Sequence, residues 1–147
     1  MGGQLTIKQL EQKAAEIRRD IIKMLEQAGS GHSAGPLGLA DIFAALYFHI
    51  LNIDPKNPDY NERDVLYLSN GHTAPVLYAA MAEAGFFDKA ELMTLRKFGS
   101  RLQGHPERKM LPGLESTSGP LGSGLSQAAG YAYSLQYLDK LKHRFVY

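Results

Sequence analysis

Val65-Leu-Tyr-Leu-Ser-Asn-Gly-His-Thr-Ala-Pro75 is the stretch of this sequence that decides the fold. Residues 65–68 form a short, continuous apolar run, which is typical of a parallel strand covered on both faces. The next three residues interrupt the run, and Pro75 stands where proline prefers to begin a helix, which we expect to end near Ala84. The stretch therefore predicts a strand, a turn and a helix, as in an α/β fold.

His72 lies in the predicted turn, between the carboxyl end of the strand and the start of the helix. Ligands bind at this edge in open α/β sheets, and the free N–H groups at a helix start favour phosphate. Histidine also exchanges protons near neutral pH. We interpret His72 as a ligand-site residue, with simple capping of the helix as the alternative.

Two further glycine–histidine pairs, Gly31-His32 and Gly104-His105, also lie outside the predicted helices. Glycine allows a backbone to approach a ligand closely. The stretch from Gly99 to Gly124 lacks convincing periodicity, and loops of that length are usually functional. It ends in the glycine-dense loop Ser118-Gly-Pro-Leu-Gly-Ser-Gly124. We therefore expect His32, His72 and His105 to face one pocket.

Apolar residues spaced three and four apart predict the remaining helices. The first runs from Ile7 to Ala28, with Thr6 and Gln9 as a capping box and Gly29 at its end. Others are expected at about residues 41–51, 89–97 and 123–141, and residues 145–147 read as the opening of another strand. The residues expected to face inward in the second and third of these helices are Ile42, Ala45, Leu46, His49 and Ile50, and Leu92, Leu95 and Phe98.

Composition narrows the class of protein. A length of 147 residues suits one domain with a core. Sixteen basic and 15 acidic residues are interleaved, which argues against nucleic acid and membrane surfaces as partners. The absence of cysteine excludes disulfides and thiolate metal sites and fits a cytoplasmic protein. No apolar run approaches about 20 residues, so we expect no membrane span.

The common catalytic motifs are missing. Three imidazoles are enough in principle for zinc, but there is no HExxH motif and no other local geometry to support a metal site. No GxSxG motif marks a serine hydrolase, and residues 119–124 lack the GxGxxG order of a dinucleotide fold. Donors and acceptors on glycine loops remain, and they suit chemistry performed by a bound organic cofactor.

Five ordered motifs carry a resemblance to one family. They are Gly31-His-Ser-Ala-Gly-Pro-Leu-Gly38, Leu68-Ser-Asn-Gly-His-Thr-Ala-Pro75, Gly104-His-Pro-Glu107, Leu111-Pro-Gly-Leu-Glu115 and Ser118-Gly-Pro-Leu-Gly-Ser-Gly124. The order is that found at the start of transketolases. From about Ile17 to its last residue, the chain resembles the N-terminal region of a transketolase or the N-terminal subunit of a split transketolase.

The resemblance implies an α/β fold with a parallel sheet flanked by helices, helix-rich in this chain. Residues 1–147 would form one domain, the first portion of the thiamine diphosphate-binding domain. The implied reaction moves a two-carbon ketol unit between sugar phosphates, with thiamine diphosphate and Mg²⁺ or Ca²⁺ as cofactors. By resemblance, His32 and His105 bind the donor sugar, His72 lies beside the diphosphate and the reacting carbon, and the cofactor contacts are Gly119, Pro120 and Leu121.

The chain also departs from the family pattern. In the family, the strand that begins near Phe145 continues into Gly-Asp-Gly, and its Asp and a later Asn bind the metal. This sequence stops before both, so we expect no metal ligands and no activity from the chain alone. The expected partner is a C-terminal transketolase subunit or a pyrimidine-binding domain, in a homo- or hetero-oligomer. The alternative is a truncated, non-catalytic homologue that acts as a scaffold or regulatory partner.

Overall fold

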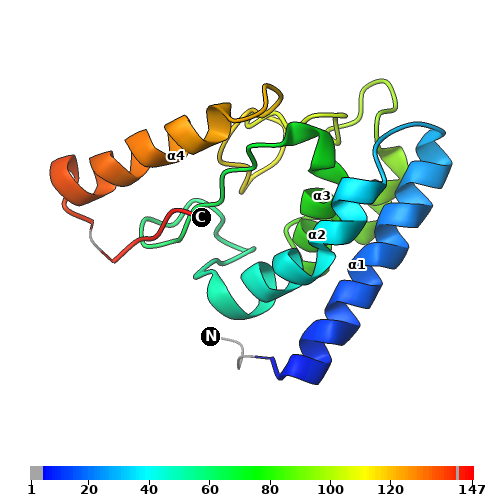
Figure 1. Cartoon of the computed structure of the whole chain (residues 1–147), viewed down its shortest axis with the longest axis horizontal. Helices are drawn as coiled ribbons and strands as arrows, with labels where there is room; N and C mark the ends of the chain where they lie inside the picture. Colours follow the sequence, from blue (N-terminus) through cyan, green and yellow to red (C-terminus); the bar gives the residue numbers. More distant parts are fainter. Residues whose placement is uncertain (1–4, 142) are drawn as a thin grey trace.

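The computed structural model describes residues 5–141 and 143–147, and its described part is mainly helical. Three α-helices, α1, α2 and α3, lie together, and α4 extends away from them (Figure 1). Two π-helical turns, η1 and η4, prolong α2 and α4, and two 3-10 helices, η2 and η3, flank α3. In chain order the bounds are α1 Ile7–Ala28, α2 Ala34–Ala45, η1 Leu46–Ile50, η2 Gly71–Thr73, α3 Ala74–Ala84, η3 Lys89–Thr94, α4 Ser123–Tyr133 and η4 Ser134–Leu138.

The helix predicted from Ile7 to Ala28 is confirmed as α1, and both of its ends lie where they were predicted. The Gln9 N–H donates to the Thr6 hydroxyl, and the Thr6 N–H donates to Gln9 Oε1 at 2.9 Å, which completes the capping box. Gly29 ends the helix in the left-handed region, with φ 64°. The apolar stripe predicted for this helix buries Ile17, Ile21 and Met24 completely.

Helix α3 is the centre of the core. Every residue from Ala74 to Ala82 is buried, and α1 and α2 both pack against it. Its many alanines allow neighbouring helices to approach closely, while Tyr78 and Met81 fill the remaining space. The Tyr78 hydroxyl donates to the Gln103 carbonyl at 2.9 Å, so a buried polar atom also ties the loop before His105 to the core.

The second predicted helix was placed incorrectly. It begins at Ala34 instead of residue 41, and Pro36 fits within its first turn because the N–H groups there need no acceptor inside the helix. The predicted buried face was also wrong: Ile42, His49 and Ile50 are exposed. Helix α2 is apolar around most of its circumference, with Asp41 as its one charged residue, so spacing alone did not distinguish its faces. The residues that are buried in α2 and η1 are Pro36, Ala40, Phe43, Ala44 and Tyr47.

The third and fourth predicted helices are shorter than expected. Residues Lys89–Thr94 form a 3-10 helix, and the prediction that Phe98 faces inward is wrong because Phe98 is fully exposed. Leu92 and Leu95 are buried as predicted. After Leu95 the chain turns sharply at Arg96, whose φ is 61°, and this turn keeps the helix from reaching residue 97. In the last helix, α-geometry ends at Tyr133 and a π-helical turn follows to Leu138.

The two predicted strand segments lie side by side, but the described residues form only one isolated bridge between them, parallel and joining Val65 and Val146. Its hydrogen bonds run from the Val65 N–H to the Phe145 carbonyl at 3.0 Å and from the Tyr147 N–H to the Val65 carbonyl at 2.9 Å. The Tyr67 N–H adds a bond to the Tyr147 carbonyl at 2.9 Å. The parallel direction agrees with the prediction, and the sheet itself stays a prediction.

Across the described helices, none has the length and apolar character that a membrane span requires.

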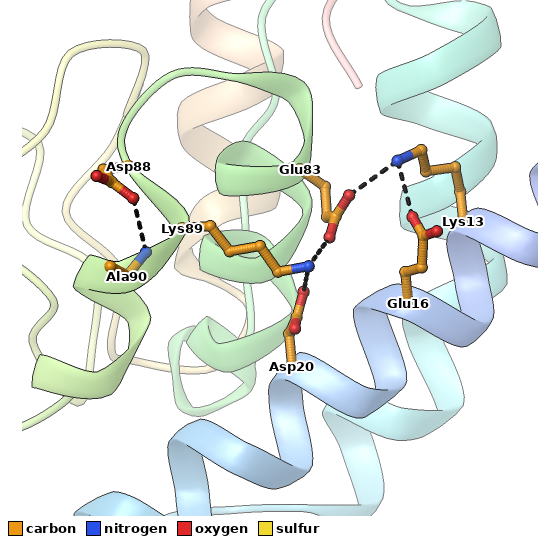
Figure 2. A network of polar contacts seen from close by, with 7 residues as sticks. All are labelled: Lys13, Glu16, Asp20, Glu83, Asp88, Lys89 and Ala90. Atoms are coloured by element: carbon orange, nitrogen blue, oxygen red, sulfur yellow. Dashed lines mark hydrogen bonds and ion pairs between the residues drawn. The ribbon is translucent and has the colours of Figure 1, made fainter.

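A polar network joins α1, α3 and η3 beside this core (Figure 2). The Lys13 ammonium lies 2.8 Å from Glu83 Oε2, and the Lys89 ammonium contacts both Glu83 and Asp20, the latter at 2.8 Å. Burial of Glu83 opposes its ionisation, but hydrogen bonds from the two lysines outweigh this and lower its pKa from 4.5 to about 2. Burial raises the pKa of Asp20, and Lys89 offsets only part of that effect.

We predict that Glu83→Gln destabilises the protein by about 1–3 kcal/mol at pH 7, because two ammonium groups lose a buried anionic partner. The folded pKa of Glu83 is depressed, so its contribution is complete above pH 4.5 and is lost as the pH falls from there toward about 2. The gap in unfolding free energy between wild type and variant should therefore shrink over that range. Urea unfolding at several pH values measures it.

Glu16→Gln is the matched control, since Glu16 pairs with Lys13 at 2.7 Å but is more exposed than Glu83. It should cost less than about 1 kcal/mol. Equal losses from both variants, or a gap that is constant from pH 7 to pH 2.5, would contradict the role given to Glu83.

Candidate functional site

The turn after residue 68 packs directly against the glycine-dense loop. The Ser118 hydroxyl donates to the Leu68 carbonyl, and the Gly122 N–H donates to the Ser69 carbonyl at 3.4 Å. A Cβ on Gly71 would lie 2.6 Å from the Ser118 carbonyl oxygen, and one on Gly124 would lie 2.7 Å from Ser69 Cα. Only glycine permits this backbone contact at both positions.

This junction determines what the glycine-dense loop exposes. Gly71 contacts Ser118 and Gly119, so His72 follows directly after the point of contact. Gly119 has open space where a side chain would stand, Pro120 is exposed, and Leu121 is 71% exposed. An uncovered backbone beside an exposed apolar side chain suits a flat, partly apolar ligand.

His32 and His72 are brought together as predicted. Their ring centroids are 5.0 Å apart, in an edge-to-face arrangement with 64° between the planes. The approach follows from packing of α2 against η2, where a Cβ on Gly35 would lie 2.9 Å from Thr73 Cγ2. His32 is exposed and His72 is half-buried, so both rings are accessible to a ligand.

The two rings line a small hollow of about 10 Å³, which has room for about one water molecule and is partly open to solvent. Its walls come from the end of α1, the loop before α2, the start of α3 and the turn after η3. The lining residues are Leu25, Gly31, His32, His72, Pro75, Leu95, Arg96 and Gly104.

His105 is exposed and does not line this hollow. Its loop is nevertheless held at the site on both sides. Gly104 lines the hollow, and the Pro106 carbonyl accepts a hydrogen bond from the Ser118 N–H at 3.0 Å. The structure therefore joins His32 and His72 directly, and it joins His105 to them only through the backbone of its neighbours.

Sequence reasoning did not place the exposed Arg96 at the hollow. It was assigned to a predicted helix at 89–97, where an arginine reads as an exposed surface residue. Its left-handed backbone depends on a hydrogen bond from its own N–H to the Leu102 carbonyl at 2.9 Å, and no local sequence pattern announces that contact.

Comparison with known proteins identifies the family to which the chain belongs. Residues 10–144 match the family described as transketolase, thiamine diphosphate binding domain. The chain belongs to this family, and the class of protein is therefore a thiamine diphosphate-binding domain.

Individual transketolases are also similar to this chain in sequence and in structure. Transketolase from Mus musculus is 43% identical over 144 residues, which cover 96% of this chain and 22% of that protein. A 6-deoxy-6-sulfo-D-fructose transketolase subunit from Clostridium sp. (strain MSTE9) is 41% identical over 127 residues, covering 86% of this chain and 46% of that subunit. The solved transketolase from Leishmania mexicana superposes with a TM-score of 0.85 at 34% identity, covering 92% of this chain and 20% of that one. The chain thus spans between about a fifth and about half of the length of these relatives.

We predict that Gly71→Ala destabilises the protein by about 1–3 kcal/mol, because the added Cβ forces the turn away from the glycine-dense loop. Gly130→Ala is the control: it adds a methyl group to α4 where no atom lies within 4 Å, and it should stabilise by about 0.5–1 kcal/mol. Urea unfolding followed by circular dichroism measures both. A Gly71→Ala protein as stable as wild type would show that the junction tolerates a side chain.

Proposed function

We propose that this chain is the N-terminal part of a thiamine diphosphate-dependent transketolase, which transfers a two-carbon ketol unit between sugar phosphates. The observation that carries the proposal is the backbone junction between Gly71 and Ser118. In a chain that belongs to the transketolase family, this junction holds the His32–His72 pair next to the loop that contains Gly119 and Leu121.

The residues present fit the organic part of the cofactor. Gly119 offers an open backbone, Pro120 and Leu121 offer exposed apolar surface, and His72 offers an imidazole at the start of α3. The described residues contain no group of three or more His, Cys, Asp or Glu side chains that is placed to hold a metal ion. In the family the metal ligands are the Asp of a Gly-Asp-Gly segment and a later Asn, and we propose that the same segments hold Mg²⁺ or Ca²⁺ in the complete enzyme.

Each histidine has a proposed task. When bound, thiamine diphosphate supplies the carbon nucleophile and stabilises the negative charge that develops during transfer. His32 and His105 bind the donor sugar near its carbonyl and first hydroxyl. Each well-placed donor contributes about 3–4 kcal/mol, because it is already oriented where charge develops on oxygen. His72 lies beside the diphosphate and moves a proton at the reacting centre.

The proposed assembly follows from the same family. Residues 1–147 are the first portion of the diphosphate-binding domain, and the extended segments at 65–67 and 145–147 belong to its parallel sheet. The partner is a C-terminal transketolase subunit or a pyrimidine-binding domain, in a cytoplasmic homo- or hetero-oligomer, and the chain is inactive without it. The Clostridium relative is itself named a transketolase subunit, which supports a division of this enzyme between polypeptides.

Ketol transfer between sugar phosphates tests the proposal. The protein is assayed together with the polypeptide that completes the domain, in the presence of thiamine diphosphate and Mg²⁺. We expect His72→Ala to lower the rate by about 10²-fold or more, because a positioned proton-transfer group is lost. His49→Ala is the control, since His49 is exposed on η1 and lies outside the hollow.

A folded wild-type assembly that transfers no ketol unit would contradict the proposal and would favour the scaffold alternative. Equal rates for His72→Ala and His49→Ala would contradict the role of His72 alone.

A further inference from the structure

We propose that Tyr78 is a positioning residue for His105, because its hydroxyl bonds the backbone just before Gly104 and His105 to the middle of α3. This inference rests on the proposed function, in which His105 binds the donor sugar. It adds a residue that lies outside the hollow and outside the five motifs that carry the family resemblance.

The first observation is the burial of the Tyr78 hydroxyl. The side chain is completely buried, and its hydroxyl donates to the Gln103 carbonyl at 2.9 Å. Burial raises the pKa of this hydroxyl well above its ordinary value of 10, so it remains a donor across the neutral pH range. A phenylalanine ring would fill the same space without a polar atom to satisfy, so core packing alone does not account for the tyrosine.

The second observation is that the loop after η3 sets its own shape. The Arg96 N–H donates to the Leu102 carbonyl at 2.9 Å, and the Leu102 N–H donates to Ser100 Oγ at 3.0 Å. Ser100 Oγ also lies 2.7 Å from the Thr94 hydroxyl. These contacts are all local, so they do not fix the position of the loop relative to α3.

Two other contacts hold this loop against the core. The Leu102 side chain is completely buried, and the Gln103 carbonyl accepts the Tyr78 hydroxyl. In the part of the chain that the structure describes, the latter is the one hydrogen bond between residues 96–105 and α3. Apolar contact is non-directional, whereas a hydrogen bond depends on distance and angle. The Tyr78 bond therefore determines where the backbone enters Gly104.

The third observation is that both ends of this hydrogen bond lie close to a candidate site residue. Tyr78 lies less than two helical turns after His72, on the helix that begins beside it. Gln103 shortly precedes His105, and the Pro106 carbonyl on the other side accepts an N–H from the glycine-dense loop at 3.0 Å. His105 is therefore held between α3 and that loop. Such support is needed because a binding group must stay within about 0.5 Å of its productive position.

The test is steady-state ketol transfer by the assembly described above, with Tyr78→Phe in place of the wild-type chain. Phenylalanine keeps the ring in the core and removes only the donor. We expect the KM for the donor sugar phosphate to rise by about three- to tenfold, because binding by His105 is weakened. The kcat and the KM for the acceptor should change by less than about twofold, because the lost contact serves donor binding.

Tyr60→Phe is the matched control. The Tyr60 hydroxyl also donates to a backbone carbonyl, that of Asn52 at 3.0 Å, but it lies outside the hollow. This variant loses an equivalent hydrogen bond and should keep the wild-type kcat and both KM values. A donor KM for Tyr78→Phe that equals that of Tyr60→Phe would overturn the proposal.

Combination with His105→Ala separates positioning from a general loss of stability. In the His105→Ala background, Tyr78→Phe should change the donor KM by less than about twofold, because the residue that it positions is gone. The full effect of Tyr78→Phe in that background would overturn the proposal.

Hydrogen exchange of the purified chain tests the Tyr78 bond without an activity assay. In Tyr78→Phe the amides within residues 102–107 should exchange about threefold faster or more, while α1 and α3 keep their protection. Unchanged exchange in 102–107, or equally faster exchange throughout the chain, would overturn the proposal. A wild-type assembly without ketol transfer, in a chain that shows this local effect, would contradict the proposed function alone. An active assembly whose donor KM is unaffected by Tyr78→Phe would contradict this inference alone.

Discussion

The arrangement of the site depends on a close contact between two backbones. Residues 69–71 and 118–124 come from distant parts of the chain, and they meet where Gly71 and Gly124 leave no room for a side chain. Glycine loops lose much conformational freedom on folding, so something rigid must hold them in place. Helix α3 performs this task, because it is buried over nearly its whole length and begins two residues after His72.

The polar network and the hollow are formed by the same secondary-structure elements. Lys13 and Asp20 belong to α1, Glu83 to α3, and Lys89 begins η3. The same elements continue into the walls of the hollow: α1 supplies Leu25 near its end, α3 begins beside His72, and η3 leads into the turn at Arg96. The ion pairs thus fix the relative positions of elements whose ends carry the site. The loops carry the candidate functional residues, and the packed helices hold these loops in position.

The sequence predicted correctly those helices whose ends are marked by characteristic capping residues, glycine or proline. The capping box at Thr6 and the glycine at position 29 marked α1, and Pro75 marked the start of α3. Of the three histidines expected to face one pocket, His32 and His72 line the hollow and His105 does not. Helix α2 was misplaced because it is apolar around most of its circumference, so its buried face is selected by α1 and α3 and not by its own periodicity. Arg96 was missed for a related reason: its conformation depends on a bond to Leu102, across a turn that no short motif describes.

Helix α4 has little tertiary packing within the described residues. The helix extends away from α1, α2 and α3 (Figure 1). Of its residues only Gly124 is buried, while Leu125 and Tyr133 are exposed, and Leu138 at the end of the following π-helical turn is exposed as well. A helix of 11 residues is marginal in water without tertiary packing. Within residues 5–141 and 143–147 this helix packs mainly against its own continuation, η4. Its apolar side chains therefore stay open to solvent in the described part of a chain that spans about a fifth of the length of transketolase relatives. The glycine-dense loop leads directly into α4, so whatever covers this helix also stabilises the loop that the proposed cofactor would contact.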